Sequence, residues 1–403
     1  MVGSGMAGGN AAKTLRNEGF DGAISMIGDE PGVPFGRPPL SKTYLRGEES
    51  LTGWLVDPAD WYTTNDVELI HATVDRIDVA ARRVEIAQHG PIEYSTLLIA
   101  TGGRNRRLDI PGAFMEGICQ LRTVADCDLI KGDAGGLGHA LIVGMGFIGS
   151  EVAASLRQLG LAVTAVFPGM FPLDSVLGPE MGKVMAGIHA DEGVDLMPGE
   201  AVVRFEGARR VERAVLKSGK SIECDFAIVA VGIQPNVELM EGTGVAVDNG
   251  VLVDAALRTS VPDVFAAGDV ANHLHPLFGR VRVEHYNNSE KSGTAAGKAM
   301  LGSDAPYDYL HTFWSDQYKH KIEYVGHARK WDNFVVRGSL EKRQLVGFYL
   351  EGGVVKAAVG LDRGGDPELE PDSEMAAAGR LVAQQARPAP SALGDDSVDL
   401  ARL

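Results

Sequence analysis

Cysteine is scarce in this sequence. Cys119, Cys127 and Cys224 are its three cysteines in 403 residues, and no two of them form a CxxC pair. Their scatter argues against a disulfide scaffold and a cysteine zinc site, so we expect no metal and a reducing, cytoplasmic location. Long apolar runs are also missing. No stretch approaches the roughly 20 residues that a membrane helix needs, and no signal-peptide pattern is visible, so we expect no membrane partner.

Positive charge is in short supply as well. The chain has 38 lysines and arginines against 54 aspartates and glutamates, a formal net charge of −16. This imbalance argues against nucleic acid or an anionic membrane as the main partner. An acidic protein could still dock on a local basic patch; residues 80–85 and 102–108 are candidates, although each could equally be a solvated turn. Monomer and homodimer both stay open.

Glycine, in contrast, is abundant, and it gathers at turns. Near the start, "GSGMAG" places Gly3, Gly5 and Gly8 in the spacing G-x-G-x-x-G, directly before an apolar-periodic helix. Glycine at these positions allows a tight turn and a close backbone approach to a pyrophosphate at the helix N-terminus. Asp29 and Glu30 follow about twenty residues later, where a carboxylate would bind a ribose. Only two residues precede the loop, so either the chain starts late or its first strand is short.

A second loop repeats the pattern within a complete strand–turn–helix–strand unit at 139–167. "GMGFIG" contains Gly144, Gly146 and Gly149. Two nucleotide sites in one chain suggest hydride transfer between a nicotinamide and a flavin. At the end of the unit stands Phe167, where NAD-binding folds usually have an acid, and no nearby arginine follows to bind a 2′-phosphate. NADH is favoured over NADPH.

These patterns predict an α/β fold with two Rossmann-like dinucleotide-binding domains, one inserted in the other, and a C-terminal α+β domain. The predicted boundaries are 1–105 and 232–305 for the first dinucleotide-binding domain, 106–231 for the second, inserted domain and 306–403 for the last domain. Alternating apolar stretches after residue 306 predict an antiparallel sheet. The final "RPAPSALGDD" is predicted to be an exposed tail.

Several segments together resemble a known family. "GDEPGVPFGRPPLSKTYLRG", "LLIATGG", "GMGFIGSEVA", "VGIQPN", "VFAAGDVA" and "HTFWSDQY" occur in this order. They are similar to the FAD-dependent ferredoxin reductases of oxygenase systems, the group of putidaredoxin reductase and the biphenyl dioxygenase reductases. The resemblance spans essentially the whole chain and implies a glutathione reductase-like arrangement of the two nucleotide domains. "AVFPGMFPLDSVLGPEM" also resembles part of apoptosis-inducing factor.

The resemblance implies three catalytic residues. Lys42 would reach the flavin ring and stabilise negative charge on it, although it could be merely an exposed lysine after a proline turn. Glu151 would face the nicotinamide from the first turn of its helix, where the helix dipole alone would also favour a carboxylate. Trp314 would lie near the isoalloxazine, although an arbitrary tryptophan is more often core.

The resemblance also implies the cofactor contacts. Besides the two glycine loops, Lys42, Glu151 and Trp314, they are Ala7, Asp29, Glu30, Arg37, Val74, Thr101, Gly102, Arg122, Gly232, Gly268, Asp269 and Tyr286. The first glycine loop and its domain would bind FAD, and the second would bind NADH. Gly232 would lie close to the nicotinamide, and the FAD contacts would include Ala7, Asp29, Glu30, Val74, Arg122, Asp269 and Tyr286. Arg122 could instead be a surface cap before a helix. Glu284, His285 and Asp316 are expected on the same wall as Trp314, with no role assigned.

The cysteines constrain the electron path. None falls in "RPPLSKTYL", where relatives that reduce disulfides, peroxide or coenzyme A disulfide carry a redox-active cysteine. Electrons that arrive as hydride must therefore leave to an outside acceptor, most simply a small iron–sulfur protein. We predict an NADH-dependent FAD reductase that serves a ferredoxin or rubredoxin. Two alternatives are a diaphorase with quinone or oxygen as acceptor, and an NAD(H)-sensing interaction module like apoptosis-inducing factor.

Overall fold

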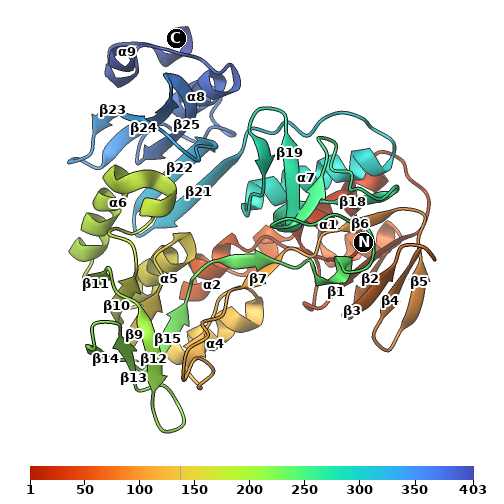
Figure 1. The fold of residues 1–403 in the computed structure, drawn as a ribbon, viewed down its shortest axis with the longest axis horizontal. Helices are drawn as coiled ribbons and strands as arrows, with labels where there is room; N and C mark the ends of the chain where they lie inside the picture. The colour runs from red at the N-terminus through yellow and green to blue at the C-terminus, as the bar shows by residue number, and fades with distance from the viewer. Residues whose placement is uncertain (137) are drawn as a thin grey trace. The chain divides into compact units, whose positions relative to one another are not determined.

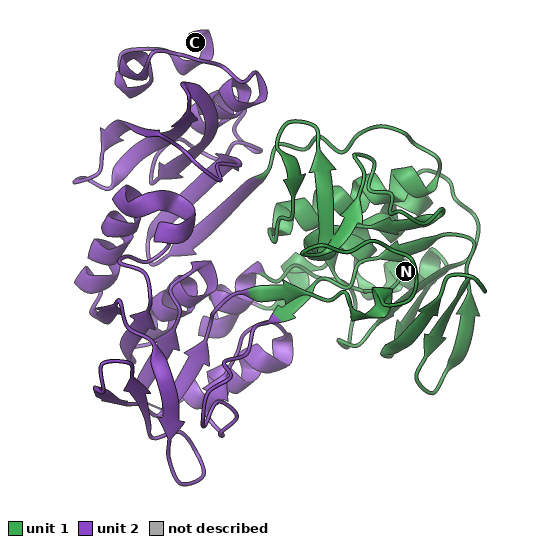
Figure 2. Cartoon of the chain, in the orientation of Figure 1, with its two compact units in different colours: residues 1–37, 50–104, 233–311 green, residues 38–49, 105–232, 312–403 purple. Residues whose placement is uncertain are grey.

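The computed structural model describes residues 1–136 and 138–403, which divide into two compact units (Figure 2). Unit 1 comprises residues 1–37, 50–104 and 233–311. Unit 2 comprises residues 38–49, 105–232 and 312–403, so the segment that carries Lys42 belongs with the second glycine loop and the C-terminal sheet. In the described part of the chain, no helix is both long and apolar enough to span a membrane.

Unit 1 is built around a parallel sheet (Figure 1). Its strands are β1 (Ile24–Gly28), β2 (Val67–His71), β6 (Leu97–Ile99) and β18 (Val264–Ala266). Val2 bridges β1 and β6 in parallel register and so occupies the central position of the sheet as a single residue. Helices α1 (Met6–Asn17) and α7 (Tyr286–Met300) pack so closely that only glycine fits at position 293. A Cβ there would lie 2.3 Å from the Ala7 carbonyl oxygen.

Smaller elements complete unit 1. One antiparallel sheet has the order β3-β4-β5. A mixed sheet has the order β17-β19-β20, in which β17 and β19 are parallel and β19 and β20 antiparallel. The bounds are α3 (Ala59–Thr64), β3 (Val74–Asp78), β4 (Arg83–Ile86), β5 (Gly90–Glu93), β17 (Val251–Val253), β19 (Ala271–His275) and β20 (Gly279–Val281). Strands β7 (Gly103–Asn105) and β16 (Ile233–Pro235) lie where the chain passes from one unit to the other.

Unit 2 holds a five-stranded parallel sheet of order β11-β10-β9-β15-β8. Its elements are α2 (Thr43–Arg46), β8 (Ile118–Cys119), α4 (Val124–Ala134), β9 (His139–Val143), α5 (Phe147–Gln158), β10 (Ala162–Phe167), α6 (Asp174–Asp191), β11 (Val194–Pro198) and β15 (Phe226–Val229). A meander of β12 (Val202–Glu206), β13 (Arg213–Leu216) and β14 (Ser221–Glu223) follows β11. The central strands are buried on both faces, as parallel strands covered by helices require.

Unit 2 also contains the predicted antiparallel sheet, of order β21-β22-β25-β24-β23. The bounds are β21 (Thr312–Gln317), β22 (His320–Gly326), β23 (Asn333–Ser339), β24 (Gln344–Glu351), β25 (Val354–Leu361), α8 (Glu374–Ala383) and α9 (Pro390–Gly394). Strands β24 and β25 are apolar almost throughout. The α/β fold class, with two parallel nucleotide-type sheets and a C-terminal α+β part, is confirmed; the domain boundaries stay a prediction.

The prediction of an exposed C-terminal tail is correct for most of residues 387–396, but the end of the chain is anchored to the C-terminal sheet. Leu393 on α9 and Leu400 are buried. Arg337, itself buried on β23, donates through its guanidinium to the carbonyl oxygens of Asp395 and Val398. The polar composition of this stretch hid the two anchoring leucines and the backbone acceptors that a distant arginine satisfies.

Candidate functional site

The first glycine loop has the shape that a pyrophosphate needs. Gly3 has φ of 116°, and a Cβ there would lie 2.1 Å from the Ala100 carbonyl oxygen. A Cβ on Gly8 would lie 2.3 Å from the Gly3 carbonyl oxygen, whereas nothing lies within 4 Å of one on Gly5. Gly5 is the N-cap of α1, with no side-chain cap and no acid in the first turn. The free N–H groups and positive helix end therefore face open space beside Gly5.

The second loop repeats this geometry. Gly144 has φ of 97° and would bring a Cβ to 2.4 Å from the Ala230 carbonyl oxygen. A Cβ on Gly149 would lie 2.0 Å from the Gly144 carbonyl oxygen, and Gly146 again faces open space. Gly146 is the N-cap of α5, which also lacks a side-chain cap and a first-turn acid. Both loops thus fit a dinucleotide pyrophosphate by the same three glycine roles.

The turn at Gly268 and Asp269 packs against the start of α1, next to the first glycine loop. Gly268 has φ of 75°, and a Cβ there would lie 3.0 Å from the Ala7 Cβ. The Gly268 N–H donates to the Ser292 hydroxyl over 3.0 Å, and Ser289 donates to Asp269 Oδ1 over 2.9 Å. The buried Asp269 carboxylate is therefore fixed beside Ala7 in unit 1, as a cofactor contact would need.

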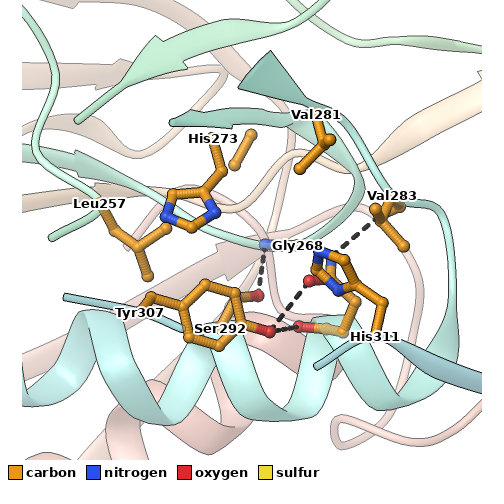
Figure 3. A pocket seen from close by; sticks show the side chains of 10 residues that line it. Leu257, Gly268, His273, Val281, Val283, Ser292, Tyr307 and His311 are labelled. Atoms are coloured by element: carbon orange, nitrogen blue, oxygen red, sulfur yellow. Dashed lines mark hydrogen bonds between the residues drawn. The ribbon is translucent and has the colours of Figure 1, made fainter. Parts of the chain in front are cut away.

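A small cavity lies behind this turn (Figure 3). Leu257, His273, Ser292, Tyr307 and His311 are among the side chains that line it. The Tyr307 hydroxyl donates to the Asn288 side chain over 2.9 Å, and the Asn288 amide donates to the Val283 carbonyl oxygen. These bonds tie the start of α7 to the irregular segments that contain Val283 and Tyr307.

Predicted adenosine-side residues in unit 1 differ in their exposure to solvent. Glu30 and Arg37 form an ion pair at 2.6 Å. Asp29 is exposed, and its backbone carbonyl oxygen lies 2.6 Å from His71 Nε2. Val74 is buried at the start of β3. The structure thus couples Glu30 to Arg37, and their contacts with FAD stay predictions.

Three further predicted cofactor contacts, Thr101, Gly102 and Tyr286, are held by local packing in unit 1. The Thr101 hydroxyl donates to the Asn236 carbonyl oxygen, and the Asn236 N–H donates to the Gly102 carbonyl oxygen. Tyr286, the first residue of α7, meets Trp54 edge-on with ring centroids 5.9 Å apart. Burial raises the pKa of Tyr286 to about 12, so its hydroxyl stays protonated at neutral pH.

Lys42 and Glu151 form a buried ion pair within unit 2. Lys42 follows the 3₁₀ turn Pro38–Ser41, and its Nζ lies 2.7 Å from Glu151 Oε2. The Ser41 hydroxyl donates to the same oxygen over 2.5 Å, and the Ser315 hydroxyl donates to Oε1 over 2.7 Å. The carboxylate therefore accepts three hydrogen bonds, which offset the cost of burying its charge.

One detail of the Glu151 prediction is wrong. Helix α5 begins at Phe147 and has no acidic residue in its first turn, so Glu151 starts the second turn. The helix dipole acts mainly within the first turn. Glu151 is consequently held by Lys42 and two serine hydroxyls rather than by the helix end.

Trp314 lies on β21, where alternation separates two faces. Ser315 and Gln317 are fully buried, whereas Trp314 is partly exposed and Asp316 is exposed. Successive side chains of a strand point to opposite faces, so Trp314 shares its face with Asp316. Its neighbour across the sheet is Glu323 on β22. The interpretation of Trp314 as core is thereby disfavoured, and its place beside the flavin stays a prediction.

Arg122 and Gly232 are the remaining predicted contacts of unit 2. Arg122 precedes α4, but Thr123 and Asp126 cap that helix with a reciprocal pair of hydrogen bonds. A cap is therefore not the role of the Arg122 side chain. Gly232 has φ of 92° and is exposed, which suits a close backbone approach. Glu284 and His285 lie in unit 1, so their sharing a wall with Asp316 stays a prediction.

The structure adds polar residues that sequence reasoning missed. Ser41 and Ser315 hold Glu151, Gln317 donates to Ser315 over 3.1 Å, and His189 on α6 lies 3.0 Å from Gln317. Ser41, Ser315 and Gln317 fall inside the two most specific motifs, "RPPLSK" and "FWSDQY", and polar residues alternating along an expected strand could have signalled the last two. Nothing local marks His189.

The three cysteines are all free thiols. Burial is the main cause that raises the pKa of each of Cys119, Cys127 and Cys224 to about 12. Such thiols are poor nucleophiles at neutral pH. Among residues 1–136 and 138–403, no group of three or more His, Cys, Asp or Glu could hold a metal ion.

The family now follows from the chain's matches. Residues 1–293 match the family described as Pyridine nucleotide-disulphide oxidoreductase, and residues 312–403 match Reductase C-terminal. The chain belongs to the pyridine nucleotide-disulphide oxidoreductases. Within that family, rhodocoxin reductase of Rhodococcus erythropolis is 37% identical over 344 residues, which is 85% of this chain and 81% of that protein. The resemblance to ferredoxin reductases is confirmed.

Two further likenesses cover nearly all of the chain. The biphenyl dioxygenase system ferredoxin–NAD(+) reductase component of Paraburkholderia xenovorans is 35% identical, over 90% of this chain and 89% of that protein. The structure of putidaredoxin reductase in its covalent complex with putidaredoxin superposes on this chain with a TM-score of 0.93 and 30% sequence identity. The superposition covers 100% of this chain and 96% of that one. The C-terminal sheet is therefore shared as well as the two nucleotide sheets.

Proposed function

We propose that this chain is an FAD-dependent NADH:ferredoxin reductase, which passes electrons from NADH to a small iron–sulfur protein of an oxygenase or cytochrome P450 system. The observation that carries the proposal is the pair of matching glycine loops combined with three free thiols, of which Cys127 and Cys224 are buried and Cys119 is partly buried. Two dinucleotides fit, and the described residues supply no exposed dithiol to take the electrons onward. The named relatives act with ferredoxin-type partners, which supports an outside iron–sulfur acceptor. The free thiols also support a reducing, cytoplasmic location.

The residues have distinct proposed roles. Gly3, Gly5 and Gly8 hold the FAD pyrophosphate, and the second loop holds that of NADH. When bound, flavin and nicotinamide supply the hydride exchange and single-electron release that side chains lack. Lys42 holds positive charge where negative charge develops, Glu151 keeps that ammonium in place, and Trp314 excludes water.

The preference for NADH rests on Phe167, the last residue of β10, and on the turn that follows it. Phe167 is buried there, and the next acid, Asp174, already accepts the N–H groups of Met170 and Phe171 over 3.0 and 3.1 Å. No arginine lies in this turn to bind a 2′-phosphate. The turn therefore offers a phosphate no charged partner, which favours NADH.

The deciding experiment is NADH-driven cytochrome c reduction by the purified yellow protein, with and without added [2Fe–2S] ferredoxins or rubredoxin, run beside NADPH. We expect a large ferredoxin-dependent rate with NADH and a smaller one with NADPH. A rate that no iron–sulfur protein raises would contradict the proposal. Fast quinone or oxygen reduction would then indicate a diaphorase, and a reduced flavin that persists in air would indicate a redox sensor.

A further inference from the structure

A chain of buried hydrogen bonds runs from Glu151 along one face of β21 to His189 on α6, within unit 2. Ser315 contacts Glu151 at 2.7 Å, Gln317 contacts Ser315 at 3.1 Å, and His189 Nε2 contacts Gln317 Oε1 at 3.0 Å. The Tyr318 hydroxyl lies 3.0 Å from His189 Nδ1. Ser315, Gln317 and His189 have no exposed surface.

The direction of every bond follows from the charge on Glu151. An ionised carboxylate only accepts, so the Ser315 O–H donates to it. The Gln317 N–H then donates to Ser315 Oγ, which leaves the Gln317 carbonyl oxygen to accept from His189 Nε2. Burial lowers the pKa of His189 to about 4, so the ring is neutral with one N–H. Its Nδ1 therefore accepts from Tyr318, and all four hydrogens point toward Glu151.

We propose that Ser315 and Gln317 are positioning residues for the hydride-transfer site, which act through Glu151 and are aligned by His189. The chain is polarised in one direction, and its members strengthen one another. It orients the Glu151 carboxylate toward Lys42. The Gln317 amide neither gains nor loses a proton at neutral pH, so the chain orients the carboxylate and does not conduct protons.

Other charges near the pair stay constant in the test. Lys42 is the sole cation bonded to Glu151 in the described residues. Asp316, on the opposite face of β21, interacts electrostatically with Lys42, Glu151 and Lys321, and partial burial raises its pKa. These groups retain their surroundings when only Gln317 is replaced.

Gln317→Glu is the decisive variant because it has nearly the same shape. While the introduced carboxyl group is protonated, it still donates to Ser315 and accepts from His189, so at low pH we expect wild-type behaviour. Once ionised, it can only accept, and it draws the Ser315 hydrogen away from Glu151. We expect the rate of FAD reduction by NADH to fall about tenfold or more as pH rises, and the FAD midpoint potential to fall with it.

Two controls separate this effect from packing. Gln317→Leu leaves Ser315 free to donate to Glu151, so its pH profile should keep the wild-type form while its melting temperature drops. Gln344→Glu makes the same chemical change at an exposed position of the same sheet and should alter neither rate nor potential. Identical pH profiles for Gln317→Glu and Gln317→Leu would overturn the proposal.

A second variant covers the case in which Gln317→Glu does not hold FAD. Ser315→Ala removes the donor itself, and we expect slower FAD reduction with a shifted potential; wild-type values for both would overturn the proposal. The inference rests on the proposed function. The rate of FAD reduction by NADH, however, is measured by rapid mixing of the protein with NADH and needs no ferredoxin. Failure of the wild-type FAD to accept electrons from NADH would contradict the proposed function, whereas a pH-independent Gln317→Glu variant contradicts the inference alone.

Discussion

At the scale of single residues, the Lys42–Glu151 pair is the most constrained feature of unit 2. Its side chains are 11% and 5% exposed, which makes either charge costly without the other. Breaking a buried pair by removing one partner costs several times more than replacing both with apolar groups. We therefore expect the loss of either side chain to lower the free energy of unfolding as well as the catalytic rate.

We expect Lys42→Met to lower the free energy of unfolding by about 3 kcal/mol, because it strands the Glu151 carboxylate. The double variant Lys42→Met/Glu151→Met should recover most of that loss while staying inactive in FAD reduction. Urea unfolding of the three proteins measures the effect. A double variant no more stable than Lys42→Met would contradict this expectation.

Trp314 provides a second prediction at this scale. Trp314→Ala should leave FAD bound and raise the oxygen-consumption rate of the reduced protein severalfold, because the indole no longer shields the flavin. Trp331→Ala, which removes an indole from the apolar cluster around Tyr349, is the control. Unchanged spectra and rates in Trp314→Ala would count against the place assigned to this side chain.

At the scale of elements, each loop–helix junction divides its glycines into two kinds. The first and third glycines are needed by the protein itself, because a Cβ would collide with backbone oxygens. The middle glycine faces open space, so its role concerns the ligand alone. This division separates folding defects from binding defects.

Gly146→Ala should fold normally, retain FAD and raise the KM for NADH about tenfold or more, because the new methyl group occupies the path of the pyrophosphate. Gly144→Ala should instead destabilise unit 2 by about 2 kcal/mol through its positive φ and the contact with Ala230. Steady-state kinetics and thermal unfolding of both variants test this pair. Equal KM values in Gly146→Ala and the wild type would remove the second loop from the nicotinamide site.

At the scale of the whole molecule, each unit encloses histidines that are neutral when folded. Burial is the main cause that lowers the pKa of His273 in unit 1 and of His189 in unit 2 to about 4. Unfolded histidine titrates near about 6.5. Above that pH neither state binds the proton, and between about 6.5 and 4 only the unfolded state does.

Stability should therefore be full above about pH 6.5 and fall as pH drops toward 4, by up to about 3 kcal/mol for each histidine. Melting curves across this range measure the loss. His273→Asn should flatten the pH dependence of unit 1, whereas His89→Asn, at an exposed position, should leave it unchanged. A slope that survives His273→Asn would locate the acid sensitivity elsewhere.

Local sequence determined a large part of this protein. Glycine spacing specifies both loops, because φ and Cβ clearance at those positions depend on a few neighbouring residues. Apolar periodicity specifies the parallel strands and the antiparallel C-terminal sheet, because the pattern of apolar residues within each strand decides which of its faces is buried. The family resemblance was equally legible, since its motifs are short and contiguous.

Tertiary structure alone decided what surrounds the reacting groups. Lys42 meets Glu151 across 109 positions of sequence, and Ser315 meets it across 164. The tertiary structure also places residues 38–49 in unit 2 and brings His189 into hydrogen-bond contact with Gln317. It packs the final residues on β23. Such pairings depend on how distant strands and helices bury their polar groups together, and no local pattern records that requirement.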